Sequence, residues 1–458
     1  MTLDRRELLR AALAAAVRAP AMRAFTPLTQ PTARARPSAS QLAWQQDELA
    51  MFIHFGVNTF TDREWGDGTE SPRLFDPSAL DARQWARTAR AAGFKAMILT
   101  AKHHDGFCLW PTRTTRHTVA ESPWRAGHGD LVREFVDACR AEGLKPGLYL
   151  SPWDRNHPTY GDSARYLDIY EQQLTELLTQ YGTIHEVWFD GANGEGPNGK
   201  RQIYDWPRIW GAVRRMQPVA VIFSDAGPDV RWIGNERGAA GTTNWSTVDP
   251  RIVTAPGVEG AEVMRSLQDG DREGTVWRPG ETDVSIRPGW FYHPAEDARV
   301  RSVDDLVALY FSSVGRNSKL LLNVPPTRAG LLHEADVASL LGMRAKLGSL
   351  FAHDLAAGGS AEWRSTGVHS AELVLELPRM AEMGIVDLRE EITQGQRVAR
   401  YRLDASDGGA WRTIARGTTI GARRLARVKA SRVRRLRLTI ADAVERPELV
   451  RIGCYGGV

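Results

Sequence analysis

The fold is decided by three runs in the N-terminal half of the chain: AMILTAK at residues 96–102, DLVREFVDACRAEG at 130–143 and PGLYLSP at 146–152. The first and third runs are short and apolar on both faces, as strands are in a parallel sheet covered by helices. The middle run starts with an aspartate suited to an N-cap and repeats apolar residues at helical spacing. This strand–helix–strand unit predicts an α/β fold.

The same unit recurs on both sides of these runs. Further strands are expected at MFIHFGVNTF (51–60), IHEVWFDG (184–191), VAVIFSD (219–225) and LLLNVPP (320–326). The helix after the first strand is expected to have Asp76 as its N-cap. About seven such strands in roughly 300 residues favour a (β/α)8-type barrel. No glycine-rich phosphate loop follows the first strand to support a doubly wound sheet.

The apolar period changes to two near residue 352. Runs such as AELVLELP (371–378) and RVRRLRLTI (432–440) alternate apolar and polar residues and are separated by turns. Such a pattern is typical of short antiparallel strands. We therefore expect a barrel over residues 43–352, followed by a C-terminal antiparallel β-sandwich over 353–458.

The N-terminal residues indicate a targeting segment. Residues 1–24 contain paired arginines, a short Ala/Leu stretch and small residues beyond it. This pattern resembles a twin-arginine export signal, so we expect an exported protein, periplasmic or secreted. An ordinary amphipathic tail is the alternative. Residues 25–42 are rich in Pro, Ser, Thr and Arg and predict a flexible lead-in to the barrel.

The composition is that of a globular protein and argues against several kinds of partner. The chain is 42% apolar and 25% charged, and its 59 Lys+Arg against 55 Asp+Glu leave +4, too little to predict a nucleic-acid surface. The densest basic run (422–438) alternates with apolar residues, which favours solvated strand faces over a polyanion site. No run could span a bilayer. The three cysteines form neither a disulfide framework nor a metal-ligand pattern, and nothing indicates an oligomeric state.

Polar and aromatic residues gather where the expected strands end, which is where barrels of this type carry their active sites. The main candidates are His54, Glu64, Trp65, His103, His104, Trp188, Asp190, Glu236 and Glu281. The chain also holds 15 Trp against 13 Phe and 10 Tyr. Indole rings pack against the C–H faces of sugars, while imidazoles and carboxylates bond to hydroxyls. The set therefore favours a neutral polyhydroxylated ligand.

Structural roles compete with these chemical ones. His54 could be a satisfied core histidine, and Asp190 could cap a helix. Barrel metallohydrolases commonly place two histidines one residue apart on the first strand, but here that strand offers only His54. His103 and His104 are adjacent and should point to opposite sides of a strand unless a bulge intervenes. We therefore expect neither a metal nor another cofactor.

Taken together, the motifs resemble glycoside hydrolase family 29, the retaining α-L-fucosidases. They are FIHFGVNTF (52–60), EWGDG (64–68), ILTAKHHDGFCLWPT (98–112), GLYLSPWDR (147–155), VWFDGA (187–192) and GPDVRWIGNERG (227–238). The resemblance runs from about residue 44 to residue 323. The later segment WRPGETDVSIRPGWFYHP (277–294) is similar to the subgroup that prefers α-1,3/1,4-linked fucose.

The resemblance implies a reaction and assigns roles. Asp190 would be the nucleophile of a double displacement and Glu236 the acid/base, with Glu281 as second candidate. The fucose-binding residues would be His54, Glu64, Trp65, His103, His104 and Trp188. The family's arginine after the nucleophile strand is not evident at Ser224–Asp225, and Arg231 is its possible substitute. The substrate would be a fucosylated oligosaccharide or glycoconjugate. The alternatives are a carbohydrate-binding protein without turnover and a metal-dependent barrel hydrolase.

Overall fold

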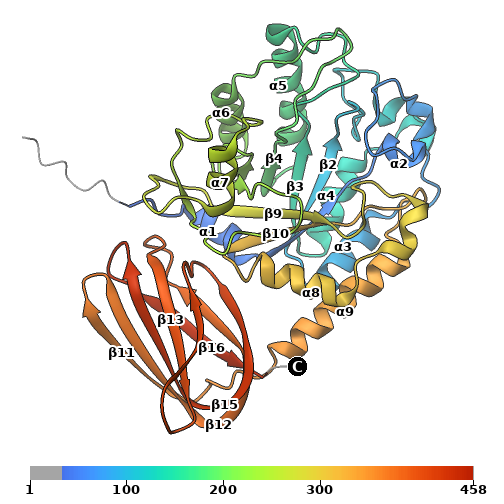
Figure 1. The fold of residues 1–458 in the computed structure, drawn as a ribbon. Coiled ribbons are helices and arrows are strands. Elements are labelled where there is room, and N and C mark those ends of the chain that lie inside the picture. Colours follow the sequence, from blue (N-terminus) through green and yellow to red (C-terminus); the bar gives the residue numbers. More distant parts are fainter. Residues whose placement is uncertain (1–33, 457–458) are drawn as a thin grey trace, which may run out of the picture. The chain divides into compact units, whose positions relative to one another are not determined.

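Eight parallel strands form a barrel in the computed structural model, which describes residues 34–456 (Figure 1). Their order in the sheet is β5-β4-β3-β2-β1-β10-β9-β6. A parallel bridge between Phe223 and Val230 joins the two ends of this order. The strands are β1 (Leu49–Ile53), β2 (Ala96–Lys102), β3 (Lys145–Leu150), β4 (Glu186–Trp188), β5 (Val221–Phe223), β6 (Arg231–Trp232), β9 (Gly280–Ser285) and β10 (Ser318–Asn323). The expected (β/α)8-type barrel is confirmed.

Helices follow seven of these strands and cover the outside of the barrel (Figure 1). They are α3 (Ala82–Ala91), α4 (Leu131–Ala141), α5 (Ser163–Thr179), α6 (Trp206–Met216), α7 (Ala261–Asp269), α8 (Val303–Ser312) and α9 (Glu334–Leu350). Within the described residues, the connection from β5 to β6 has no helix. The short antiparallel pair β7 (Thr247–Val248) and β8 (Val276–Trp277) flanks α7 in the sequence. None of the helices in residues 34–456 has the length and apolarity needed to cross a membrane.

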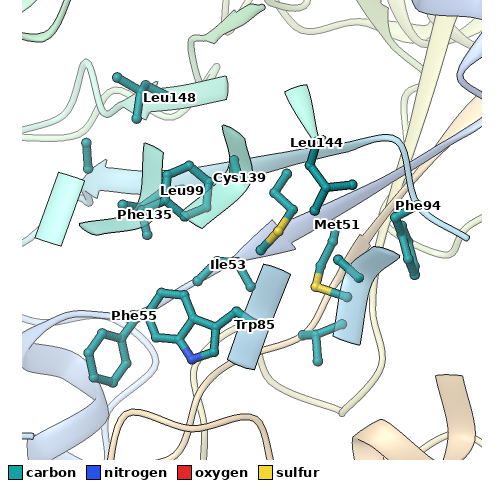
Figure 2. Close-up of a cluster of buried hydrophobic side chains, with 14 of the residues drawn as sticks. Met51, Ile53, Phe55, Trp85, Phe94, Leu99, Phe135, Cys139, Leu144 and Leu148 are labelled. Atoms are coloured by element: carbon teal, nitrogen blue, oxygen red, sulfur yellow. The ribbon is translucent and has the colours of Figure 1, made fainter. Parts of the chain in front are cut away.

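Side chains alternate between two apolar layers along the barrel strands. Phe52, Ile98 and Phe223 come from different strands and pack together inside the barrel. The neighbouring residues Met51 and Leu99 point outward and pack against the helices, with the residues shown in Figure 2. Because both faces of each strand are buried, strands such as β1 and β2 are largely apolar, as the sequence pattern indicated. An exception is β9, whose sequence GETDVS carries buried polar side chains.

Two element boundaries differ from the sequence prediction. The first strand ends at Ile53 instead of continuing to residue 60, and the short helix α2 (Val57–Thr61) follows it. The N-cap of α3 is Asp81, whose carboxylate accepts the Arg83 N–H at 2.9 Å, instead of Asp76. Both aspartates suit an N-cap by sequence, so the choice between them depends on where the chain leaves the loop and packs on the barrel.

The chain before β1 is partly helical. Helix α1 (Ala39–Gln46) begins at a capping box in which Ser38 and Gln41 bond to each other's backbone N–H. The flexible lead-in expected over residues 25–42 is therefore wrong for its last four residues. The export signal expected over residues 1–24, and the lead-in up to residue 33, lie outside the described residues.

The antiparallel β architecture expected after the barrel is also confirmed. Six strands form one hydrogen-bonded sheet in the order β11-β12-β15-β13-β14, with β16 paired to β12. They are β11 (Ser360–Gly367), β12 (Ser370–Glu390), β13 (Val398–Ser406), β14 (Arg412–Gly417), β15 (Arg424–Ala443) and β16 (Leu449–Tyr455). The two longest strands carry register shifts, and the domain has an apolar core of its own.

Candidate active site

A cavity of about 1410 Å³ opens at the carboxyl ends of the barrel strands. Eight residues singled out from the sequence line it: His54, Glu64, Trp65, His103, His104, Trp188, Asp190 and Glu236. They come from three strand ends and two loops that are far apart in the sequence. The barrel brings them together because parallel strands present their carboxyl ends on one face.

Asp190 follows β4 and is held by one donor on each carboxylate oxygen. Its Oδ2 accepts the Tyr149 hydroxyl at 3.0 Å, and its Oδ1 accepts the Ala192 N–H at 2.7 Å. The next helix starts only at Trp206 and is capped by Asp205, so Asp190 caps no helix. Two donors without a cationic partner orient the carboxylate and leave its charge available in the cavity.

Three other carboxyl groups in the cavity have raised pKa values. Burial raises the pKa of Glu236, and the nearby charge of Asp190 raises it further. Burial also raises the pKa of Asp225 to about 6, with Asp190 contributing, although the Gly257 N–H opposes the shift. Burial and Glu236 raise the pKa of Asp283 well above its usual range. An oriented carboxylate thus shares one cavity with proton-holding carboxyl groups, as acid–base chemistry requires.

His54 is locked into one tautomer by Asn323. Its Nδ1 lies 2.8 Å from the Asn323 Oδ1, while the Asn323 amide nitrogen donates to the Ser285 Oγ and the Trp290 carbonyl. The orientation of that amide makes Nδ1 of His54 the donor, which leaves Nε2 as an acceptor. Burial, in the main, lowers the pKa of His54 to about 3. A neutral imidazole suits the binding of a sugar hydroxyl.

A serine gives His104 the same tautomer. The Ser151 hydroxyl donates to the Trp153 carbonyl at 2.7 Å and lies 2.7 Å from Nδ1 of His104. Because that hydroxyl has only one proton, Nδ1 of His104 must be the donor. Nε2 then faces Oδ2 of Asp190 at 3.8 Å. Burial lowers the pKa of His104 despite the Asp190 charge, so two acceptors face each other until a ligand hydroxyl or a proton comes between them.

His103 and His104 line the same cavity instead of pointing to opposite sides, and the exception that the sequence analysis allowed for is present, because the β2–β3 register shifts between Thr100 and Lys102. Strand β2 ends at Lys102, and a turn in which the Gly106 N–H donates to the His103 carbonyl follows. The two rings lie 4.1 Å apart. In residues 34–456, no group of three or more His, Cys, Asp or Glu side chains is arranged to hold a metal ion.

Two tryptophans singled out from the sequence, Trp188 and Trp65, line the cavity walls. Trp188 stacks on Phe223 with 4.0 Å between ring centroids, and its indole N–H donates to Oε1 of Glu281 at 3.0 Å. Trp65 is 55% exposed and meets His104 edge to face. The wall formed by Trp188 is therefore held rigidly, whereas Trp65 extends into solvent where a ligand would enter.

Glu64 connects two loops at the cavity edge. Its carboxylate accepts the backbone N–H groups of Trp290 and Phe291 and faces Nε2 of His293 at 2.9 Å. Nδ1 of the same imidazole lies 2.9 Å from Asp62. These contacts fix the position of Glu64 between the segments that follow β1 and β9.

Two alternatives raised by the sequence take structural roles. Glu281 is fully buried, does not line the cavity and accepts the Trp188 indole N–H, so its position favours Glu236 over this second candidate for the acid/base. Arg231 is also buried, and its guanidinium donates to the carbonyls of Leu267 and Arg278. It does not replace the family's arginine in the cavity.

Several lining residues were visible in the sequence at strand ends but were not singled out. They are Tyr149, Trp153, Asp225, Trp232, Asp283, Trp290 and His293. The tyrosine sits within an apolar strand, and the two aspartates resemble many loop aspartates. Only the strand-end rule marks them, and it does not separate ligand contacts from supporting residues.

Lys102, the last residue of β2, is a buried cation beside the histidine pair. Its ammonium donates to Tyr166 at 2.8 Å, to Gln173 at 2.9 Å and to Asp154 at 3.2 Å. The Lys102 and Asp154 side chains are 0% and 2% exposed. Burial would raise the pKa of Asp154, but the Lys102 charge and neighbouring hydrogen bonds lower it to about 2.

We expect Lys102→Met to lower the free energy of unfolding by about 3–5 kcal/mol at pH 7, because the partner carboxylate stays buried without its cation. In the parent, the folded-state pKa of Asp154 is depressed, so its stabilisation is present above pH about 4 and lost as the pH falls toward 2. In the variant, burial without the Lys102 charge should raise the pKa of Asp154, so the carboxyl group takes up a proton as the pH falls from 7 to 4 and the deficit shrinks. Urea unfolding at pH 7 and pH 4 measures both effects.

The control for this prediction is Lys346→Met, which removes an exposed lysine paired with Asp304. Its loss should stay below about 1 kcal/mol. Equal deficits for Lys102→Met at both pH values would contradict the electrostatic explanation.

Comparison with known proteins matches this chain to fucosidases both by sequence and by structure. A family model described as α-L-fucosidase matches residues 13–348. The α-L-fucosidase 1 of Arabidopsis thaliana is 41% identical over 449 residues, covering 92% of this chain and 87% of that protein. A solved glycoside hydrolase 29 family member from a rumen bacterium is 40% identical, with a TM-score of 0.86 over 94% of this chain and 78% of that one. A glycoside hydrolase 29 fucosidase of Ruminococcus gnavus, solved in complex with fucose, is 30% identical, with a TM-score of 0.84 over 94% and 96% of the two chains.

Proposed function

This chain belongs to the α-L-fucosidases of glycoside hydrolase family 29, and on that premise we propose that it releases terminal α-1,3- or α-1,4-linked fucose with retention of configuration. Asp190 is the nucleophile in this proposal and Glu236 is the acid/base. The supporting observation is a carboxylate oriented by Tyr149 and Ala192 in the same cavity as a carboxyl group whose pKa is raised by burial and by that carboxylate.

The first step forms a covalent intermediate. An oxygen of Asp190 attacks the anomeric carbon as the bond to the glycosidic oxygen breaks, and the proton of Glu236 moves to that departing oxygen. The products of this step are a fucosyl ester of Asp190 and the released alcohol. Glu236 is now a carboxylate.

The second step returns the enzyme to its starting state. Glu236 takes a proton from water as the water oxygen attacks the anomeric carbon, and the ester bond to Asp190 breaks. Meanwhile the acceptor nitrogens of His54 and His104 receive hydrogen bonds from sugar hydroxyls. Trp188 and Trp65 supply apolar surface for the ring.

Two measurements test this proposal. Proton NMR of the first product from an aryl α-L-fucoside should show α-fucose ahead of mutarotation, whereas inversion would show the β anomer. A panel of α-1,2-, α-1,3- and α-1,4-fucosylated oligosaccharides tests the linkage. A preference for the α-1,2 substrate would contradict the linkage proposal and leave the mechanism standing.

Trp290→Phe should shift the alkaline limb of kcat/KM to higher pH. The Trp290 side chain hydrogen-bonds Glu236 and opposes the rise in the pKa of that carboxyl group caused by burial and Asp190. Without this bond the pKa rises further, and the acid keeps its proton to higher pH, by about 1 pH unit for a hydrogen bond to a charged group worth roughly 1.4 kcal/mol. The measurement is the pH dependence of kcat/KM on a fucosylated oligosaccharide.

The matched control is Trp232→Phe, which removes an indole N–H that donates to Asp283 at 2.8 Å. Because the pKa of Asp283 is already well above its usual range, losing this bond should leave the limb in place. A shift of equal size in both variants would show that the limb does not report the Trp290–Glu236 contact.

A further inference from the structure

Positive charge is concentrated in the C-terminal domain. Residues 353–458 carry 18 Lys+Arg against 13 Asp+Glu, whereas residues 1–352 carry 41 against 42. Within residues 398–437 the counts are 12 and 2. The small net charge of the whole chain therefore conceals a strongly basic segment, which forms β13, β14 and most of β15.

A hollow of about 360 Å³ lies on this segment. Arg400 and Arg402 of β13 and Arg416 of β14 line it, with Thr418 and Thr439 nearby. Among the described residues that line this hollow, none is acidic. These five residues define what we call the arginine groove.

The strand register sets two of these cations against each other. Arg402 lies directly opposite Arg416 in the β13–β14 ladder and opposite Thr439 in the β13–β15 ladder. Directly opposed residues share a face of the sheet, and like charges at such positions are destabilising. An anion between the two guanidinium groups would convert this repulsion into attraction.

The acids nearest the groove are already engaged. Asp404 accepts Nε of Arg402 and Nη2 of Arg437, both at 3.0 Å. Asp442, which lies opposite Arg400 in the ladder, pairs with Arg272 at 2.8 Å. One carboxylate is thus shared between two arginines, and the other is held by an arginine outside the groove.

Arg416 differs from other arginines of the basic segment. Arg423 is buried and pairs with Glu48 and Asp387, and Arg434 pairs with Glu376. Within residues 34–456, no hydrogen bond or ion pair is found for the exposed guanidinium of Arg416. Structural ion pairing therefore explains part of the basic segment, including Arg402, but not Arg416.

We propose that the arginine groove binds an anionic glycan chain through a sulfate ester or a uronate carboxylate. Guanidinium forks match the paired oxygens of both groups, and the two threonine hydroxyls can bond to neighbouring sugar hydroxyls. The volume suits a ligand the size of one or two sugar residues. A second glycan site on the same chain would also raise the effective concentration of a polymeric substrate near the barrel.

The test measures binding of the full chain at 150 mM NaCl by affinity electrophoresis with dextran sulfate, polygalacturonate and neutral dextran. We expect retardation by one or both anionic polymers, which identifies the anionic group, and none by neutral dextran. The double variant R402Q/R416Q should lose at least about tenfold in affinity. The control K429Q/R432Q removes the same charge from exposed positions of the same domain outside the groove and should lose less than about threefold.

Folding is checked independently. R402Q/R416Q removes a like-charge pair but also the Arg402–Asp404 contact, and Asp404 keeps Arg437 as a partner, so the thermal midpoint should stay within a few degrees of that of the parent. If the double variant does not fold, Arg416→Lys replaces it in the binding experiment. This variant keeps the positive charge but loses the planar guanidinium group, so it should bind the anionic polymer more weakly than the parent.

Three outcomes would overturn the proposal. They are equal losses in the groove and control variants, no binding of either anionic polymer by the parent, and groove-dependent binding of duplex DNA or anionic vesicles that exceeds binding of the polysaccharides.

Discussion

Asp190→Ala should lower kcat on an aryl α-L-fucoside by about 10⁴-fold or more, because no other group is placed to form the covalent intermediate. The dissociation constant for fucose should change little, since the histidines, Glu64 and the tryptophans that line the cavity remain. Steady-state kinetics and calorimetric titration with fucose measure the two effects separately.

Two further variants make this result specific. Asp190→Asn keeps the side-chain shape and should be as inactive as the alanine variant. Asp225→Asn alters another lining carboxyl group, one that bonds to the Gly257 N–H and has a pKa of about 6. We expect this variant to lose far less. Substantial turnover by Asp190→Ala, or a larger loss in Asp225→Asn, would overturn the assignment.

Glu236→Gln should produce a loss that depends on the leaving group. On a fucosylated oligosaccharide, whose departing alcohol needs a proton, kcat/KM should fall by about 10²–10⁴-fold. On a dinitrophenyl fucoside, whose leaving group departs as a stable anion, kcat/KM should fall by less than about tenfold. The ratio of these losses separates proton donation from general damage to the site.

Two other carboxyl groups are competing candidates for the proton donor. Asp283 also has a raised pKa and lines the cavity, so Asp283→Asn is the critical comparison. Glu281→Gln tests the candidate that lies outside the cavity. If Asp283→Asn shows the leaving-group dependence and Glu236→Gln does not, the proton donor is Asp283.

Much of the site was predictable because of how parallel barrels are built. Strand ends in sequences such as AKHHDG and WFDG converge on one face whatever the loop lengths, so Asp190 and the histidines could be placed together. The geometry around them was not predictable. The tautomer of His54 depends on Asn323, which lies 269 positions away.

The differences from the prediction have physical reasons as well. The His103–His104 prediction applied to a continuing strand, but the chain turns after Lys102. Helix α1 could have been found, because Ser38 and Gln41 have the spacing of a capping box. The arginine groove was missed because the sequence analysis considered only the densest basic run (422–438), whereas the three arginines of the groove precede it and are brought together by the pairing of β13 with β14.

The strand that precedes Glu236 is the thinnest part of the barrel. Only Arg231 and Trp232 of β6 pair with β9, and on its other side the sheet continues through a single bridge at Val230. The buried Arg231 fork ties this short strand to the chain around it. The proposed acid/base, Glu236, therefore follows the part of the barrel with the fewest strand-pairing hydrogen bonds, where local opening should be easiest. On heating, turnover should be lost through local opening around β6 at a lower temperature than the one at which tryptophan fluorescence reports global unfolding. Among the barrel strands, amide hydrogen exchange should be fastest in β6.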